Sequence, residues 1–186
     1  MKVLSVLGSP RRNGNTALLA KEYTRGLLSN NKDNEIKEIF LQEKNIKCCM
    51  ACDGCKDAKN NICVLDDDMR DMYLLIEEAD LIIFSTPIYW WSMSAQLKIF
   101  IDRIYGMGNK KSLIDKKVVL LMTYGGELPN SGPSLVENTF KEICDFIGMD
   151  FLYSYGTCTG NGILVKDNIE VLKKVFKLGY ELEKDI

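Results

Sequence analysis

Two patterns of hydrophobic and polar positions take turns along the chain, and they predict strands and helices in alternation. Short, continuous apolar runs are typical of strands that are buried on both faces of a parallel sheet. Such runs, together with one segment of mixed character at residues 35–41, predict strands over residues 3–7, 35–41, 81–85, 117–123 and 149–155. Apolar side chains that recur every three or four positions are typical of amphipathic helices. They predict helices over residues 17–28, 66–78, 94–107, 134–147 and 168–182.

Five strands that alternate with five helices predict a doubly wound α/β fold, with a five-stranded parallel sheet and helices on both faces. Pro87 is expected to end the third strand. Three aspartates at residues 66–68 are expected to open the second helix, because acidic side chains favour a helix N-terminus. The 186 residues contain no repeat, linker or low-complexity tract, so we expect a single domain over residues 1–186.

Composition and charge exclude several classes of function. A net charge of -2 gives no reason to expect nucleic acid as a partner. No apolar run approaches the ~20 residues of a membrane span, and no signal peptide is recognisable, so we expect a cytoplasmic protein without a membrane partner. The chain has no histidine, which excludes histidine-dependent triads and histidine metal ligands. Hydride or electron chemistry would therefore need a cofactor.

The segment that joins the first strand to the first helix, residues 8–16, is predicted to bind a phosphate. Backbone N–H groups and the helix dipole attract anions at such a turn. The side chains expected to contact the phosphate are those of Ser9, Arg11, Asn15 and Thr16. A Walker A loop is excluded, because five residues separate Gly8 from Gly14 and Asn15 stands where the lysine would be. The alternative is an ordinary helix start capped by Asn13 or Asn15.

Two further loops follow buried strands, at the edge of the sheet where ligands bind in such folds. The first is rich in aromatic side chains, which are costly to expose unless something flat covers them. The second contains two glycines, which bring backbone amides to the same place. The candidate contacts are Pro87, Ile88, Tyr89 and Trp90 in the first loop and Thr123, Tyr124, Gly125 and Gly126 in the second. Together the three loops predict a flavin mononucleotide (FMN) site; the alternative assigns the aromatics to the core or to a subunit contact, which we expect for Trp91.

These motifs resemble the NADPH-dependent FMN reductase family of the flavodoxin-like superfamily. The resemblance lies in Gly8-Ser-Pro-Arg with Gly14-Asn-Thr16, in Pro87-Ile-Tyr-Trp90 and in Leu97-Lys-x-Phe-x-Asp-Arg103. It implies the strand order 2-1-3-4-5, FMN as cofactor and NAD(P)H as co-substrate. It also implies a homodimer or homotetramer, for which residues 89–93 are a candidate contact. Lys98, Asp102 and Arg103 match a family signature, and we expect them to be structural charges.

Seven cysteines in a chain without a secretory signal indicate metal or redox use rather than structural disulfides. Residues 47–63 form a cysteine-rich loop whose candidate metal ligands are Cys49, Cys52, Cys55 and Cys63. Thiolates at two-residue gaps can wrap the corners of one cubane, whereas zinc sites usually present two separated Cys-x-x-Cys pairs. The pattern resembles the iron–sulfur flavoprotein branch of the family, which implies a 4Fe–4S cluster near the flavin. Two alternatives remain open: thiols that only pack or form disulfides, and a redox dithiol.

The remaining thiols have simpler assignments. Cys48 would be a spare thiol, and Cys144 and Cys158 are expected to be buried structural residues. The expected function is an FMN-dependent oxidoreductase that moves electrons between a reduced donor, NAD(P)H or ferredoxin, and a small-molecule or protein acceptor. The alternatives are a cluster-free NAD(P)H-dependent FMN or quinone reductase and, in another class, a non-catalytic metal- or flavin-binding module. Because no dinucleotide-binding motif is present, nicotinamide use rests on the resemblance alone.

Overall fold

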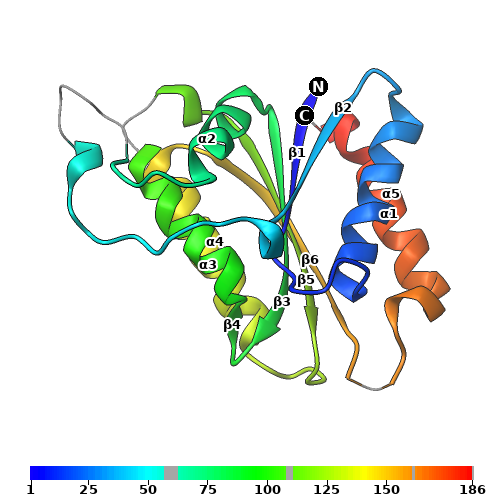
Figure 1. Ribbon diagram of the computed structural model, residues 1–186. Helices are drawn as coiled ribbons and strands as arrows, with labels where there is room; N and C mark the ends of the chain where they lie inside the picture. The colour runs from blue at the N-terminus through cyan, green and yellow to red at the C-terminus, as the bar shows by residue number, and fades with distance from the viewer. Residues whose placement is uncertain (57–62, 108–110, 161, 186) are drawn as a thin grey trace.

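The computed structural model describes residues 1–56, 63–107, 111–160 and 162–185. A parallel sheet lies at its centre (Figure 1). Its strands are β1 (Lys2–Leu7), β2 (Glu35–Phe40), β3 (Leu81–Tyr89), β5 (Lys117–Tyr124) and β6 (Asp150–Cys158), in the order β2-β1-β3-β5-β6. Counted over these parallel strands, this is the predicted order 2-1-3-4-5. A short additional strand, β4 (Ser92–Met93), pairs antiparallel with the end of β3.

Helices cover both faces of the sheet, as the alternating pattern predicted. They are α1 (Asn15–Asn30), α2 (Met69–Glu78), α3 (Ala95–Ile104), α4 (Gly132–Ile147) and α5 (Ile169–Asp185). Helices α1 and α5 lie side by side on one face, and α2, α3 and α4 lie on the other (Figure 1). Helix α3 is followed by a 3₁₀ turn, η3 (Tyr105–Met107). None of the helices in the described parts of the chain is long and apolar enough to cross a membrane.

Alternate residues of the central strands supply two separate cores. On β3, Ile82 and Phe84 pack on the side of α2, α3 and α4, whereas Leu81 and Ile83 pack on the side of α1 and α5. All four side chains are at most 2 % exposed. Burial on both faces explains why these strands read as continuous apolar runs rather than as an alternating pattern. The strand ends are thereby fixed on a rigid frame.

The third strand continues through Pro87 to Tyr89, so the prediction that Pro87 would end it was wrong. The Ser85 carbonyl accepts a hydrogen bond from the Gly8 N–H (2.7 Å), so this residue faces the β1 side of the strand. Because backbone groups alternate in direction along a strand, the nitrogen of Pro87 faces the same side. Strand β1 has already ended there, at Leu7. The missing N–H of the proline therefore removes no ladder hydrogen bond.

Helix α2 begins at Met69, after the three aspartates that were expected to open it. Two of these carboxylates have partners elsewhere. Asp67 accepts a hydrogen bond from the Lys47 N–H (3.0 Å), and Asp68 accepts one from the Asn45 N–H (2.8 Å). The acidic run thus ties the start of α2 to the segment that precedes the cysteines.

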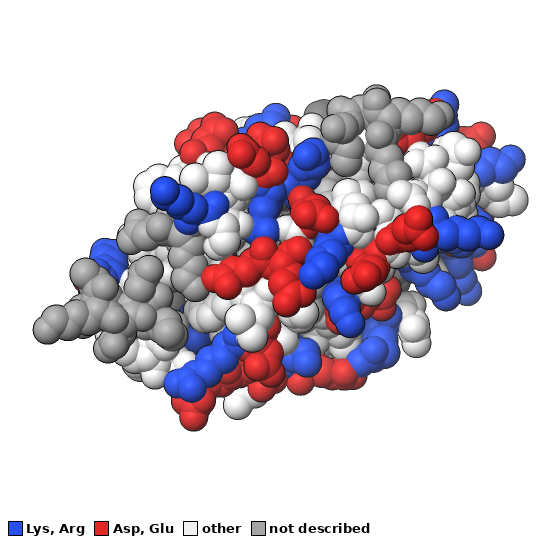
Figure 2. All heavy atoms as spheres, turned by 90° about the horizontal axis from the view of Figure 1, so that it is seen from above, with Lys and Arg blue, Asp and Glu red and all other residues white. Residues whose placement is uncertain are grey.

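The end of the molecule at which the strands begin carries charges of both signs. Figure 2 looks onto this end and shows Lys and Arg interspersed with Asp and Glu among the described residues. Such a mixed surface creates no strong field of one sign at this end of the molecule. It agrees with the near-neutral net charge of the sequence.

Candidate functional site

The three loops singled out in the sequence meet at the carboxyl ends of β1, β3 and β5, where they line two adjoining cavities. The first, of about 190 Å³, is lined by Ser9, Arg11, Gly14, Asn15, Thr16, Pro87, Ile88, Tyr89, Thr123, Tyr124, Gly125 and Thr159. The second, of about 260 Å³, is lined by Ile88, Trp90, Trp91, Tyr124, Gly125, Gly126 and Asn130. Every residue expected to contact FMN lines one of them. Together they reach the size of a small-molecule site, ~300 Å³ or more.

The loop between β1 and α1 is organised by its own polar groups. The Ser9 hydroxyl accepts a hydrogen bond from the Arg11 N–H (3.1 Å), and the Gly14 N–H donates to the Arg11 carbonyl (3.2 Å). Helix α1 then starts with Gly14 at its N-cap and no side-chain cap, so the capping alternative for Asn13 or Asn15 is wrong. Among the described residues, no side chain caps the first N–H groups of α1, which remain for an anion.

Asn15 and Thr16 are held by contacts beyond the loop. The Asn15 side-chain oxygen accepts a hydrogen bond from the Val165 N–H (3.1 Å), so only its NH₂ group remains for a phosphate. The hydroxyls of Thr16 and Thr123 lie 2.7 Å apart in a buried contact. One hydroxyl donates to the other, which leaves one hydroxyl proton for a phosphate oxygen. Thr123 thereby joins the phosphate loop (residues 8–16) to the glycine loop (residues 123–126).

The aromatic loop is a tight hairpin between β3 and β4. Tyr89 pairs with Ser92, and Trp90 and Trp91 form the two-residue turn, with φ angles of 49° and 59°. Turns of this type favour asparagine or glycine, and the left-handed conformation costs other residues roughly 1–2 kcal/mol each. Trp90 is 90 % exposed. An exposed pair of strained tryptophans beside a cavity indicates a functional use of the strain.

Replacement of Trp90 by asparagine is expected to stabilise the protein without FMN by about 1 kcal/mol, because asparagine tolerates the left-handed conformation. The same variant should bind FMN more weakly, since it lacks the aromatic surface. Denaturant unfolding without FMN and a fluorescence titration with FMN measure the two effects. Trp90→Phe is the matched control, because it keeps both the ring and the strain. A less stable Trp90→Asn protein would contradict this account of the turn.

The end of β6 supports the glycine loop, and sequence reasoning missed this contribution. The Thr159 N–H donates to the Tyr124 carbonyl (2.8 Å), and the Cys158 thiol donates to the Gly125 carbonyl (3.7 Å). A Cβ atom at Gly160 would overlap the carbonyl oxygen of Gly125. The sequence predicted that this strand would end at residue 155, whereas β6 continues to Cys158 and so brings the residues that follow it, Thr159 and Gly160, beside the glycine loop. Burial was correctly expected for Cys144, whereas Cys158 is only partly buried.

The cysteine-rich loop forms a separate cavity of about 350 Å³. Its lining includes Cys49, Cys52, Cys55 and Cys63, with Asp102 of α3 and Tyr105 of η3. Residues 57–62 of this loop lie outside the described residues. Within the described ranges, no three cysteine or carboxylate side chains converge closely enough to hold a single metal ion. Four thiols around one cavity fit instead the donor set of a cubane, which separates its ligands more widely than one ion does.

Helix α3 lies between the cysteine cavity and the two cavities at the strand ends, called the strand-end cavities below. Among the described residues, none lines both the cysteine cavity and a strand-end cavity. At the N-terminus of α3, the Ser94 hydroxyl donates to the Gly8 carbonyl (2.5 Å) and accepts a hydrogen bond from the Leu97 N–H (3.3 Å). Asp102 and Tyr105, at the other end, line the cysteine cavity. A helix of 10 residues is about 15 Å long, which sets the scale of the separation within one chain.

The signature charges on α3 are ion pairs, as expected for structural residues. Lys98 pairs with Asp102 (2.5 Å) at the surface, and Arg103 pairs with Asp67 (2.6 Å) in the interior. Burial opposes the charge on Asp67, but hydrogen bonds from Arg103 and from backbone N–H groups hold the pKa of Asp67 below its usual value. The carboxylate therefore stays ionised beneath the cysteine-rich loop.

Comparison with protein-family models matches residues 1–152 to the family described as NADPH-dependent FMN reductase. The chain belongs to this family. The match spans the phosphate loop, the aromatic hairpin, the glycine loop and the cysteine-rich loop. An FMN-dependent oxidoreductase with a flavodoxin-like fold is thereby established, as the resemblance implied, and the non-catalytic alternative is set aside.

Individual relatives agree with this assignment. An iron–sulfur flavoprotein of Archaeoglobus fulgidus is 30 % identical over 182 residues, which cover 98 % of this chain and 79 % of the relative. A putative NAD(P)H-dependent FMN-containing oxidoreductase of Bacillus subtilis, YwqN, is 28 % identical over 176 residues, covering 90 % and 91 %. The solved structure of an NAD(P)H:quinone oxidoreductase from Methanothermobacter marburgensis shares the fold, with a TM-score of 0.74 at 17 % identity over 98 % and 97 % of the two chains.

Proposed function

We propose that this FMN-dependent oxidoreductase is an iron–sulfur flavoprotein that passes electrons between a reduced donor, NAD(P)H or a ferredoxin-type protein, and an acceptor. The observation that carries the proposal is the single cavity lined by Cys49, Cys52, Cys55 and Cys63. Iron–sulfur clusters are held by such thiolate sets, and short two-residue gaps are typical of them. The name of the Archaeoglobus fulgidus relative supports the same function.

The strand-end cavities supply what an FMN site needs. Arg11, the Thr16 hydroxyl and the first N–H groups of α1 would bind the phosphate. Trp90 would cover the isoalloxazine ring, with Gly125 opposite it. Bound FMN supplies hydride acceptance and release of single electrons. The backbone of the glycine loop would offset negative charge on the reduced ring.

Residues 89–93 remain the proposed contact between copies of the chain in a homodimer or homotetramer. Tyr89, Trp90 and Trp91 are 47 %, 90 % and 54 % exposed. Aromatic side chains of this kind are enriched at the centres of protein interfaces. Such a contact would also cover the open side of the flavin cavity and exclude water from the cofactor. The proposed location of the enzyme is the cytoplasm.

A second candidate is a cluster-free NAD(P)H-dependent FMN or quinone reductase. It is favoured by the similarity to the Bacillus subtilis relative, whose name mentions FMN and NAD(P)H but no cluster. In that case the cysteines would be packing residues, would form disulfides on oxidation or would act as a redox dithiol. The two candidates differ in iron content and share the same flavin site.

Replacement of Arg11 by alanine is expected to weaken FMN binding about 10- to 100-fold, because a hydrogen bond to a charged group contributes roughly 1.5–3 kcal/mol. Arg12→Ala is the matched control. Arg12 pairs with Glu43 and stacks on Phe40, 4.6 Å from the ring centre, and it does not line the strand-end cavities. Titration of the FMN-free proteins with FMN measures both affinities. Equal affinities for the two variants would contradict the assignment of the phosphate site.

Turnover tests the proposed function. Protein loaded with FMN is mixed without oxygen with NADH, NADPH or reduced ferredoxin, and bleaching of the flavin band is followed. Quinone or free flavin is then added as the acceptor. We expect at least one donor to bleach the flavin and the acceptor to restore its absorbance. A flavin that no donor reduces would contradict both enzyme candidates.

A further inference from the structure

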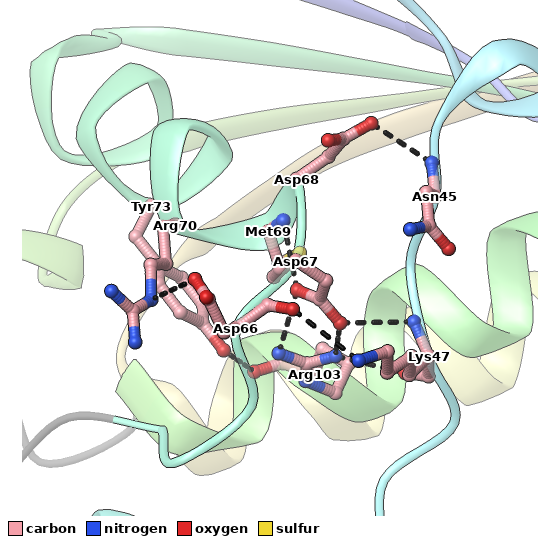
Figure 3. Close-up of polar contacts among 9 residues, drawn as sticks. All are labelled: Asn45, Lys47, Asp66, Asp67, Asp68, Met69, Arg70, Tyr73 and Arg103. Atoms are coloured by element: carbon pink, nitrogen blue, oxygen red, sulfur yellow. Dashed lines mark hydrogen bonds and ion pairs between the residues drawn. The ribbon is translucent and has the colours of Figure 1, made fainter.

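A buried ion pair between Arg103 and Asp67 lies at the base of the cysteine-rich loop (Figure 3). The two side chains are 1 % and 0 % exposed, and they share two hydrogen bonds, of 2.6 Å and 3.1 Å. Removing both charges from water is costly, so a buried pair is weak evidence for stability by itself. The role of the pair is therefore sought in the segments that it holds together.

The pair joins the two ends of the cysteine-rich loop to helix α3. Arg103 donates to the Lys47 carbonyl (2.8 Å), and Asp67 accepts a hydrogen bond from the Lys47 N–H (3.0 Å). Lys47 directly precedes the cysteines, and Asp67 follows Cys63 closely in the sequence. The Asn45 N–H donates to the Asp68 carboxylate (2.8 Å; Figure 3), and the Asp68 N–H donates to the Asn45 carbonyl (3.2 Å), so the same two segments are joined twice more. Both ends of the loop thus meet at one guanidinium group.

One donor of this guanidinium is left over. Among the described residues, the Arg103 Nε–H is buried and has no hydrogen-bond acceptor. A buried donor without an acceptor is costly and calls for an explanation. The Cys63 thiol interacts electrostatically with Arg103 and with the Tyr73 hydroxyl. That hydroxyl donates to the Arg103 carbonyl (3.0 Å), so the three residues form one contiguous group.

We propose that Arg103 is a positioning residue for the metal-binding thiolates, and that its Nε–H donates to the sulfur of Cys63 when that sulfur is a metal ligand. The inference rests on the proposed iron–sulfur function. Four thiolates bring negative charge into the cavity, and the buried Nε–H of a cationic side chain is a strong hydrogen-bond donor to such a sulfur. Hydrogen bonds to ligating sulfurs also help to set a cluster's reduction potential. Tyr73 acts through Arg103, because its only hydroxyl proton is donated to the Arg103 carbonyl.

Arg103→Lys tests the proposal, because it keeps the positive charge but lacks the Nε–H and the fork that binds Asp67. Its matched control is Arg70→Lys: Arg70 lies near the same site but pairs with Asp66 at the surface (3.4 Å). Both proteins are purified without oxygen, and three quantities are measured: FMN content, the rate of iron loss to a chelator, and the cluster midpoint potential from a mediated redox titration followed by electron paramagnetic resonance.

We expect Arg103→Lys to keep its FMN, to lose iron about tenfold faster than wild type and to have a lower midpoint potential, since a donor to the ligand sulfur is gone. Arg70→Lys should match wild type in all three measurements. Wild-type iron loss and potential in Arg103→Lys would overturn the inference.

Tyr73→Phe covers the case in which Arg103→Lys fails to fold. It removes only the hydroxyl that donates to the Arg103 carbonyl, which loosens the position of Arg103, and it should change iron loss and potential in the same direction by a smaller factor, about threefold for iron loss. Unchanged values in Tyr73→Phe would overturn the inference in that case. Wild-type protein that binds FMN but takes up no iron would instead refute the proposed iron–sulfur function, so the two failures are distinguishable.

Discussion

Alanine at position 160 is expected to weaken FMN binding about 100-fold. The Cβ atom of the new side chain would overlap the carbonyl oxygen of Gly125, so the glycine loop must move. The overlapping atom belongs to the backbone, which cannot swing aside as a flexible side chain can. Moving Gly125 displaces the amides that would face the flavin, and each backbone hydrogen bond to a charged group contributes roughly 1.5–3 kcal/mol.

Gly162→Ala is the matched control for this prediction. It adds the same methyl group two positions further on, where no described residue other than its chain neighbours lies within 4 Å, although its φ of +85° makes alanine somewhat strained. Titration with FMN, at a temperature well below the unfolding transition of both proteins, separates loss of the site from loss of the fold. Wild-type FMN affinity in Gly160→Ala would show that the glycine loop does not bind the flavin.

Serine in place of Cys49 is expected to reduce the iron content from about four per chain to below about one. Iron–sulfur clusters bind thiolates, and a serine hydroxyl stays protonated where a ligand must be negatively charged. Cys48→Ser is the matched control, because Cys48 is equally exposed, adjacent in sequence and outside the lining of the cysteine cavity. Iron and acid-labile sulfide assays on anaerobically purified protein provide the measurement.

FMN content should be the same in both cysteine variants, because the cysteine cavity and the strand-end cavities have no lining residue in common. Equal iron in Cys49→Ser and Cys48→Ser would exclude Cys49 as a ligand. Parallel loss of FMN and iron in Cys49→Ser would show that the two sites depend on each other. That result would contradict the independence expected from their separation by α3.

The sequence pattern predicted correctly those strands and helices that are determined by the residues within them. The apolar runs at residues 3–7 and 117–123 appear as β1 and β5, because a strand buried on both faces needs only that pattern. The end of β3 was missed, because whether Pro87 breaks a strand depends on where its neighbour β1 ends. The start of α2 was missed for a similar reason: Asp67 has a partner on α3 that no local pattern reveals.

The same distinction holds for the sites. Loops that follow parallel strands must meet at one edge of the sheet, so Arg11, Trp90 and Gly125 could be grouped from the sequence. Thr159 and Gly160 approach from β6, and only the register of β6 against β5 brings them there. The spacing of the cysteines predicted a common set of metal ligands, and the four candidates line one cavity. The residues that anchor their loop come from distant parts of the chain and could not be read from that spacing.

The central claim is that one chain holds both FMN and an iron–sulfur cluster. The most direct test is an ultraviolet–visible spectrum of protein purified without oxygen, with FMN, iron, zinc and acid-labile sulfide measured on the same sample. The account predicts flavin bands above a broad absorption, with about four irons and four sulfides per chain. Flavin bands without iron, or zinc in the place of iron, would contradict it.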